Sequence, residues 1–244
     1  MLNKFFRACQ AFIRKYFFNP RWRCISCGRE IFGDKPFCEK CESELPFNDK
    51  AICAHCGRAV IAPEDYCSTC KGIITDIDEG RSVFKYEPPV SALIKKAKYK
   101  NAKYLLPIFA EYLFFVYAAR YSDSDLICFI PMTDKAKKKR GYNQSEIMAE
   151  ELSVKSGVPV FYGVVKKHDT PRQATLGREE RLKNLTEAFA VTDKNAVKGK
   201  KIVIVDDVTT TGSTAQAMAC KLKKYGAERV NLLTVASVAP PDGY

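Results

Sequence analysis

The segment from Lys201 to Thr214 constrains the fold more than any other part of the sequence. Four apolar residues, Ile202 to Val205, lead directly into Asp206 and Asp207, and the chain then continues as VTTTGST. A short apolar run bounded by turn residues is typical of a buried strand, so we expect both carboxylates to lie at the rim of a sheet. The glycine and hydroxyl residues that follow predict a tight loop that opens a helix.

Strand and helix patterns alternate on both sides of this segment from Gly80 onward. We expect strands at 83–86, 126–130, 160–165, 202–205 and 229–235. We expect helices at 89–99, 103–120, 144–156, 179–185 and 214–225. Apolar strands separated by helices predict an α/β fold with a mainly parallel sheet covered on both faces. Ligands of such sheets bind at the carboxyl ends of the strands.

The loop after the two aspartates has the chemistry of a phosphate site. Backbone N–H groups, hydroxyls and the positive end of a helix dipole together attract a phosphate monoester. The candidate phosphate ligands are Thr209, Thr210, Thr211, Gly212, Ser213 and Thr214. Adjacent carboxylates suit the vicinal hydroxyls of a sugar, and they can hold Mg²⁺ through water because that ion prefers oxygen ligands.

The N-terminal third contains four C-x-x-C pairs in a tandem repeat. The pairs are Cys24/Cys27, Cys38/Cys41, Cys53/Cys56 and Cys67/Cys70. Cys24 and Cys53 are 29 positions apart, as are Gly28 and Gly57. Two such knuckles complete a tetrahedral zinc site, so we expect two structural Zn²⁺ ions. Ligation is either sequential, with one ion in each half of the repeat, or interleaved. Disulfides are the alternative, and they belong to oxidising compartments.

Size and charge limit the remaining possibilities. The 244 residues are 46% hydrophobic and 28% charged, which favours a globular protein with an appended module. The net charge of +12 favours a polyanionic ligand, either a phosphate compound or nucleic acid. The longest apolar stretch, 105–119, contains Glu111 and is too short to span a bilayer. We therefore expect a cytoplasmic protein without a membrane span.

Two basic segments are candidates for contact with a diphosphate. KKKRGYNQSE follows a predicted strand, and we expect a flexible basic loop there that includes Arg140. The polar segment TPRQATLGREERLKNL is long enough to form a lid, and it carries Arg172. The cysteine-rich repeat, which has the form of two zinc ribbons, adds basic and aromatic residues that suit nucleic acid, namely Arg21, Trp22, Arg23, Arg29 and Arg58.

The segment IVIVDDVTTTGST resembles the phosphoribosyl pyrophosphate motif of type I phosphoribosyltransferases. Together with the four C-x-x-C pairs, KRGYNQSE and TPRQATLGREERLKNLTEAF, it makes nearly the whole chain resemble the ComF family. The resemblance implies a type I phosphoribosyltransferase fold, Rossmann-like, behind a small double zinc ribbon, and an association with imported DNA during natural competence. It also implies that Asp206 and Asp207 contact the ribose and that the Thr209–Thr214 loop holds the 5'-phosphate.

Two functions follow from these expectations. In the first, the protein binds phosphoribosyl pyrophosphate with Mg²⁺ and transfers the phosphoribosyl group to an unknown acceptor, with Asp206, Asp207, Arg140 and Arg172 as catalytic residues. In the second, the same pocket senses a nucleotide or diphosphate while the basic surface contacts single-stranded DNA and DNA-handling proteins. The expected parts are an amphipathic helix at 1–20, a double zinc ribbon at 21–73 and a phosphoribosyltransferase-like domain at 80–238.

Overall fold

The computed structural model describes residues 23–33, 35–49, 51–60, 66–67, 70–71, 75–168 and 184–239. It divides the chain into two compact units, Met1–Leu45 and Pro46–Tyr244. The second half of the cysteine repeat therefore belongs to the same unit as the sheet. Several predicted features lie outside the described residues, namely the helix at 1–20, Arg21, Trp22, Arg172 and positions 179–183 of the helix expected at 179–185. The described chain is helical at 184–187, which overlaps the last two positions of that prediction.

The first unit contains little regular structure. Its described elements are an isolated bridge between Arg23 and Glu30 and the short helix α2 at Glu39–Ser43. Cys38 is the N-cap residue of α2, and Cys41 is buried on it. The short helix thus fixes the spacing of one cysteine pair.

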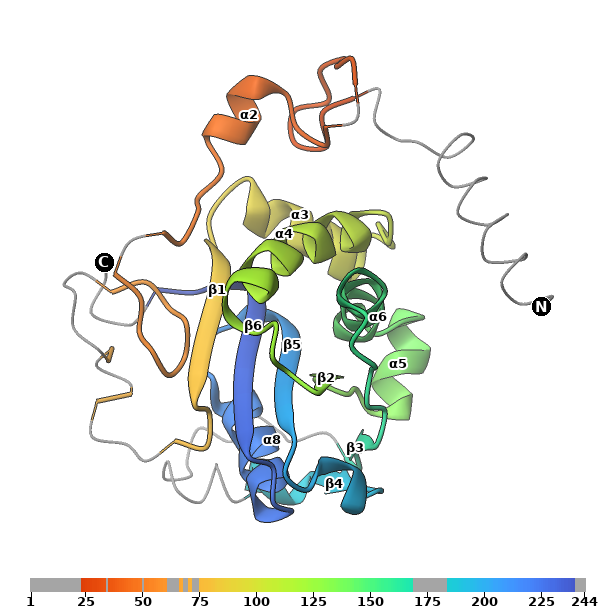
Figure 1. Cartoon of the computed structure of the whole chain (residues 1–244). Helices are drawn as coiled ribbons and strands as arrows, with labels where there is room; N and C mark the ends of the chain where they lie inside the picture. Colours follow the sequence, from red (N-terminus) through yellow and green to blue (C-terminus); the bar gives the residue numbers. More distant parts are fainter. Residues whose placement is uncertain are drawn as a thin grey trace. The chain divides into compact units, whose positions relative to one another are not determined.

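A four-stranded parallel sheet forms the centre of the second unit (Figure 1). Its strand order is β1-β6-β5-β2, and each neighbouring pair is parallel. The strands are β1 at Glu79–Lys85, β2 at Leu126–Phe129, β5 at Lys201–Thr209 and β6 at Arg229–Ser237. The predicted mainly parallel α/β sheet is confirmed.

Helices cover both faces of this sheet. The side chains of β5 alternate in direction, as they do in any strand. Ile202 and Ile204 share a buried cluster with Met218 and Leu222 of α8 (Ser213–Lys224). The opposite face of the sheet packs on α4 (Leu105–Arg120) and α6 (Gln144–Ser156). These two helices also contact each other. Burial on both faces explains the uninterrupted apolar run at 202–205 in β5.

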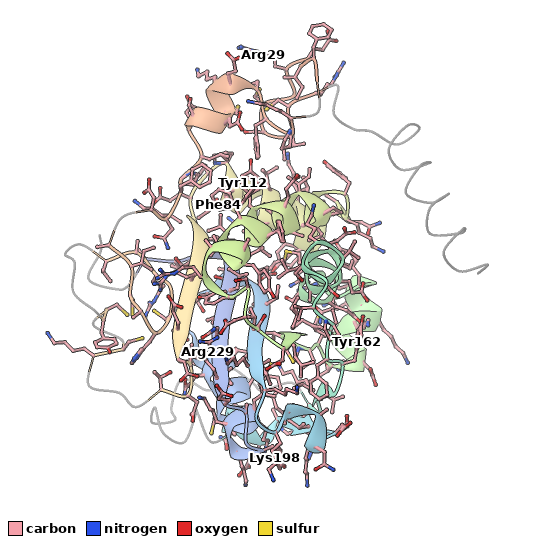
Figure 2. All side chains as sticks on the ribbon, viewed as in Figure 1. Arg29, Phe84, Tyr112, Tyr162, Lys198 and Arg229 are labelled. Atoms are coloured by element: carbon pink, nitrogen blue, oxygen red, sulfur yellow. The ribbon has the colours of Figure 1, made fainter. Side chains whose placement is uncertain are left out.

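Aromatic packing ties β1 to its covering helix. Phe84 of β1 lies edge-on to Tyr112 of α4, with 5.2 Å between the ring centroids (Figure 2). Phe47 packs against the same two rings at 5.0 and 6.2 Å. Among the described residues, no helix has both the length and the apolarity needed to cross a membrane.

Smaller elements complete the second unit. Helix α3 spans Val90–Tyr99, a 3-10 turn spans Asn195–Val197, and the antiparallel pair β3 (Val164–Lys166) and β4 (Phe189–Val191) lies beside α8. The strand predicted at 160–165 is much shorter, because only one bridge, between Val160 and Ile127, joins this segment to the main sheet.

One loop prediction is wrong. The basic segment before α6 forms helix α5 (Asp134–Arg140) rather than a flexible loop. Thr133 caps its N-terminus by accepting a hydrogen bond from the Ala136 N–H at 3.2 Å, and Gly141 ends it with φ +83°. Lysine, arginine and alanine are good helix formers, and a threonine N-cap with a terminal glycine sets both ends.

Candidate functional site

The acidic pair lies where β5 extends beyond its neighbour β2. The pairing of β2 with β5 ends at Phe129 and Val205, whereas the pairing with β6 continues to Thr209. Asp206 and Asp207 therefore have a strand on one side only. On the other side the chain leaves the sheet through α5 and α6, and this opening gives the carboxylates room to meet polar side chains.

Asp207 is buried and is held by two side chains from different helices. The Lys98 Nζ atom of α3 lies 2.9 Å from Asp207 Oδ1. The Gln144 Nε2 group at the start of α6 donates to Asp207 Oδ2 at 2.5 Å. Burial opposes the charge on Lys98, but the attraction of Asp207 outweighs it and raises the pKa of the lysine. The site thus contains its own counter-cation.

Asp206 is half-buried and accepts two hydrogen bonds at one oxygen. Ser145 Oγ donates to Asp206 Oδ1 at 2.8 Å, and the Asp207 N–H donates to the same atom at 2.9 Å. Burial, together with the neighbouring charge of Asp207, raises the pKa of Asp206 to about 7. A carboxyl group with this pKa changes its protonation state close to neutral pH, so the charge of the site depends on pH and on any cation that enters it.

The loop after the acidic pair forms the N-terminus of α8. Gly212 is the N-cap residue of α8 and has φ +75°, a conformation that side-chain-bearing residues rarely adopt. The hydroxyls of Thr211 and Ser213 lie 2.9 Å apart at the surface. Thr209 differs from the rest of the predicted set, because its side chain is buried and donates to Thr234 Oγ1 at 3.3 Å.

Arg140 lies next to this site at the end of α5. Its Nη1 group donates to Gln144 Oε1 at 2.8 Å, and its guanidinium lies 5.8 Å from the ring centroid of Tyr99. The Gln144 side chain therefore bridges Arg140 and Asp207 through one hydrogen bond to each. The structure brings Arg140, Asp206 and Asp207 into one cluster.

Three members of this cluster were not predicted from the sequence. Gln144 and Ser145 lie in the segment KRGYNQSE, which was singled out for its basic residues and not for its amides and hydroxyls. Lys98 is one of several lysines on α3, and nothing in its spacing separates it from a solvent-facing residue. Its role becomes visible only when α3 is placed beside the end of β5.

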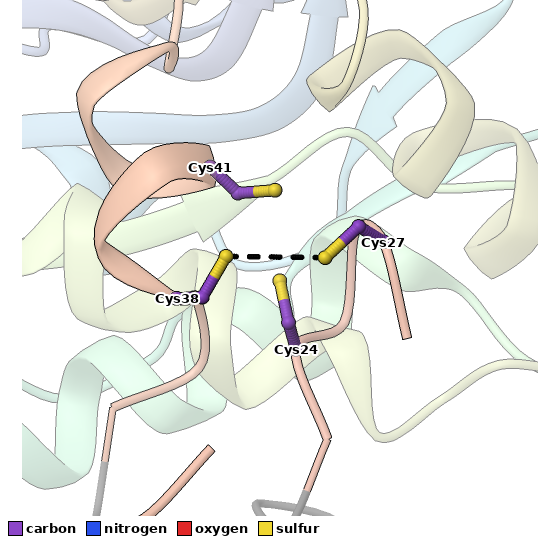
Figure 3. Close-up of side chains that lie close together, drawn as sticks. All are labelled: Cys24, Cys27, Cys38 and Cys41. Carbon is purple, nitrogen blue, oxygen red and sulfur yellow. Dashed lines mark hydrogen bonds between the residues drawn. The ribbon is translucent and has the colours of Figure 1, made fainter. Parts of the chain in front are cut away.

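The eight repeat cysteines form two separate clusters, each made of two consecutive C-x-x-C pairs, as sequential ligation requires. One cluster is Cys24, Cys27, Cys38 and Cys41 (Figure 3), and the other is Cys53, Cys56, Cys67 and Cys70. In each cluster the four sulfur atoms lie within 4.8 Å of one another. All cysteines in the described part of the chain are free thiols, so the disulfide alternative finds no support there.

The sulfur spacing fits zinc. A tetrahedral ion with Zn–S bonds of about 2.3 Å requires sulfur atoms about 3.8 Å apart. The Cys27 and Cys38 sulfurs are 3.8 Å apart, and the Cys56 and Cys67 sulfurs are 3.7 Å apart. Four thiolates leave no open coordination position, so both sites have the donor set of a structural zinc centre.

The two clusters differ in what surrounds them. Arg58 is only 2% exposed, and it donates from Nε to Cys56 Sγ at 3.3 Å and from Nη2 to Cys67 Sγ at 3.2 Å. Burial opposes its charge, but the neighbouring thiolates raise the pKa of Arg58. The predicted contact of Arg58 with nucleic acid is therefore wrong, because its side chain is buried against sulfur. Arg29, its counterpart in the repeat, is exposed (Figure 2).

Comparison with known proteins agrees with this arrangement. A phosphoribosyl transferase domain model matches residues 136–243, and a double zinc ribbon domain model matches residues 14–71. Competence protein F of Haemophilus influenzae is 29% identical over 87% of this chain and 89% of its own length. Competence protein ComFC of Bacillus subtilis is 27% identical over 64% of this chain and 63% of its own length.

A third relative has a higher sequence identity over a shorter alignment. The DNA utilization protein YhgH of Salmonella typhi is 32% identical over 62% of this chain and 68% of its own length. The zinc ribbon clusters, the parallel sheet with its acidic pair and these alignments all point to one group of proteins. The chain belongs to the ComF family, a family with a phosphoribosyltransferase-like fold and an N-terminal double zinc ribbon.

Proposed function

We propose that this protein binds phosphoribosyl pyrophosphate or a closely related phosphoribosyl ligand at the carboxyl end of β5. The observation that carries the proposal is the position of an acidic pair, Asp207 buried and Asp206 half-buried, directly before a loop that opens α8. The loop from Thr210 to Thr214 offers hydroxyls and helix N–H groups to the 5'-phosphate. The two carboxylates face the ribose hydroxyls, and a bound Mg²⁺ ion would add positive charge between the carboxylates and the diphosphate.

Two cations of the protein suit the diphosphate end of this ligand. Lys98 and Arg140 both contact the cluster around Gln144 and Asp207. When a ligand engages Asp207 through its ribose, the Lys98 ammonium becomes available to the diphosphate oxygens. Arg172, which lies outside the described residues, is proposed as a further contact to the diphosphate. Positive groups fixed in advance are effective where negative charge develops on a leaving group.

We further propose that the bound ligand undergoes group transfer. An acceptor would form a bond to C1 of the ribose while the bond from C1 to the diphosphate oxygen breaks, and the bonding electrons would leave with the diphosphate. The residues of the site orient the sugar and exclude water rather than form covalent bonds. This assigns the protein to the glycosyltransferases, with a nucleobase or an amine as the class of acceptor.

A second candidate function is binding without turnover. Tyr99 and Tyr104 are exposed, and Arg140 lies over the Tyr99 ring. Exposed aromatic rings beside positive charge suit the stacking of single-stranded bases, whereas Tyr142 is buried and donates to the Ala97 carbonyl. The names of the relatives connect those proteins with competence and DNA utilisation. We therefore propose DNA-handling proteins and single-stranded DNA as further partners, in the cytoplasm, where reduced thiols favour zinc.

The first test compares two double variants. D206N/D207N should lose at least about 3 kcal/mol of binding free energy, or about 100-fold in affinity for phosphoribosyl pyrophosphate, because each carboxylate gives up charge-assisted contacts. D123N/D125N carries the same chemical change at the opposite end of the strands, beside Lys201, and should bind as the wild type does. If a folded D206N/D207N protein binds phosphoribosyl pyrophosphate as tightly as the wild type does, the proposed site is refuted.

A second assay separates the two candidate functions. Release of diphosphate from phosphoribosyl pyrophosphate is measured with nucleobases and with amines as acceptors. Release that depends on an acceptor and disappears in D206N/D207N supports transfer. Binding without release under any acceptor favours the sensing function, which is then measured with fluorescent single-stranded DNA and with a Y99A/Y104A variant.

A further inference from the structure

The second zinc ribbon is joined to the edge strand of the sheet by backbone contacts. Gly57 forms a parallel bridge with Arg81 of β1, and the Gly80 N–H donates to the Ala54 carbonyl at 2.6 Å. Asn48 is buried and its Nδ2 group donates to the Gly57 carbonyl at 2.8 Å. The knuckle that carries Cys53 and Cys56 is therefore an extension of the sheet and not a separate appendage.

Two glycines make this close approach possible. A Cβ atom on Gly57 would lie 2.7 Å from the backbone of Arg81. A Cβ atom on Gly80 would lie 2.5 Å from the His55 carbonyl oxygen. Both distances are below any real Cβ contact, so neither position accommodates another residue without movement of the backbone. The knuckle and β1 are packed at the minimum distance that the chain allows.

The same ribbon reaches the candidate phosphate loop. Cys56 Cβ lies 3.8 Å from the position that a Gly212 Cβ would occupy, so the two residues are close neighbours. After the ribbon, Thr75 Oγ1 donates to Gln216 Oε1 at 2.5 Å, and Gln216 Nε2 donates to Asp76 Oδ2 at 2.8 Å. Gln216 lies in the first turn of α8. The second ribbon therefore lies beside the loop, and the segment directly after the ribbon is hydrogen-bonded to the helix that the loop opens.

Arg58 compensates part of the charge of the second four-cysteine site. Four thiolates and one Zn²⁺ carry a net charge of −2, and a buried charge of that size is costly unless it is paired and hydrogen-bonded. Arg58 donates to two of the four sulfurs, one from each knuckle. It therefore fixes the two knuckles relative to each other as well as lowering the charge next to a phosphate loop.

We propose that the second four-cysteine site forms a wall of the candidate phosphate loop, and that Arg58 is a positioning residue that couples the integrity of this zinc site to the geometry of the loop. The proposal deepens the function proposed above and rests on it for the identity of the ligand. The contacts themselves are independent of any ligand. The tandem repeat supplies a matched control, because Arg29 occupies the corresponding position in the first ribbon but is exposed.

The first measurement is amide hydrogen exchange of the ligand-free, zinc-loaded protein. Arg58→Met should increase exchange in residues 210–216 by about 10-fold or more, comparable to the loss of other groups that support metal ligands. Arg29→Met should leave exchange in these residues unchanged, and Arg58→Lys should fall between the two because it restores the charge but not the fork of donors. A folded Arg58→Met protein with wild-type exchange in the loop would overturn the proposal.

The second measurement uses the wild-type chain and does not depend on the folding of a variant. Zinc is withdrawn slowly with a chelator, and released cysteines are alkylated and identified by peptide mass. Exchange in the loop should rise together with alkylation of Cys53–Cys70 and not with alkylation of Cys24–Cys41. A loop that stays protected after the second site has lost its metal contradicts the coupling.

A third measurement separates this proposal from the proposed function. By linkage, a ligand that needs the loop must protect the second zinc site to the same extent that the site supports the ligand. Saturating phosphoribosyl pyrophosphate with Mg²⁺ should therefore slow alkylation of Cys53–Cys70 selectively. If calorimetry detects no binding, the proposed function fails, while the exchange measurements still decide the role of Arg58. If the ligand binds without selective protection, the role of Arg58 fails alone.

Discussion

Replacing Asp206 with asparagine should stabilise the ligand-free protein at alkaline pH. The pKa of Asp206 is raised from 3.8 to about 7 by burial and by Asp207. A raised carboxyl pKa means that the folded protein holds this proton more tightly than the unfolded chain, so the free energy of unfolding falls as pH rises from about 4 to about 7. This difference corresponds to about 4 kcal/mol as an upper limit. Because Asp206 is only half-buried, we expect about half of that value.

Asparagine preserves the contacts that hold this side chain. Both hydrogen bonds reach Asp206 Oδ1, from Ser145 Oγ and from the Asp207 N–H, and an asparagine oxygen can accept both. Asp206→Asn should therefore be more stable than wild type by about 2 kcal/mol at pH 8 and by less than about 1 kcal/mol at pH 5. Urea denaturation at the two pH values measures both differences.

The control for this experiment has the opposite sign. Hydrogen bonds from Arg229 and Lys201 lower the pKa of Asp123, so this carboxylate stabilises the folded protein above its unfolded pKa, and the contribution is lost as pH falls. Asp123→Asn should lower stability at pH 8. The reasoning about Asp206 is refuted if Asp206→Asn is destabilised at pH 8, or if its difference from wild type is the same at both pH values.

Two further predictions concern the stability of the second unit. Lys98→Met leaves Asp207 without its ion pair at 2.9 Å and should lower the free energy of unfolding by about 2–3 kcal/mol, while Lys95→Met on the exposed side of α3 should change it by less than about 0.5 kcal/mol in urea denaturation. Equal effects of the two substitutions would mean that the ion pair between Lys98 and Asp207 does not stabilise the fold. Gly57→Ala should lower the calorimetric melting temperature more than Gly28→Ala, since both have positive φ but only the Gly57 Cβ meets backbone, at Arg81. A larger loss for Gly28→Ala would contradict the packing of the second ribbon.

Much of the sheet could be predicted because its strands are buried on both faces. The predicted strand at 202–205 corresponds to the apolar start of β5, and the predicted helix at 144–156 coincides with α6. Asn143 and Gly157 cap that helix at its two ends, which made its limits readable from local chemistry. The C-x-x-C spacing predicted the two thiolate clusters in the same way, because the geometry of a knuckle is local.

Tertiary contacts could not be read in the same way. β5 continues through the acidic pair to Thr209 because β6 is long enough to pair with it, and the sequence of β5 alone gives no sign of that. Lys98 and Gln144 meet Asp207 across three different elements. Cys56 and Gly212 are close neighbours in the fold although more than half of the chain separates them in sequence. The predicted parts at 1–20, 21–73 and 80–238 stay predictions, although the described contacts divide the chain after Leu45.

Isothermal titration of phosphoribosyl pyrophosphate into the zinc-loaded protein, with and without Mg²⁺, tests the central claim most directly. We expect saturable binding of one ligand per chain that strengthens when Mg²⁺ is present, because the acidic pair and the loop engage opposite ends of one ribose. Absence of binding under both conditions would contradict the account, and it would mean that the acidic pair and the loop of α8 serve another ligand.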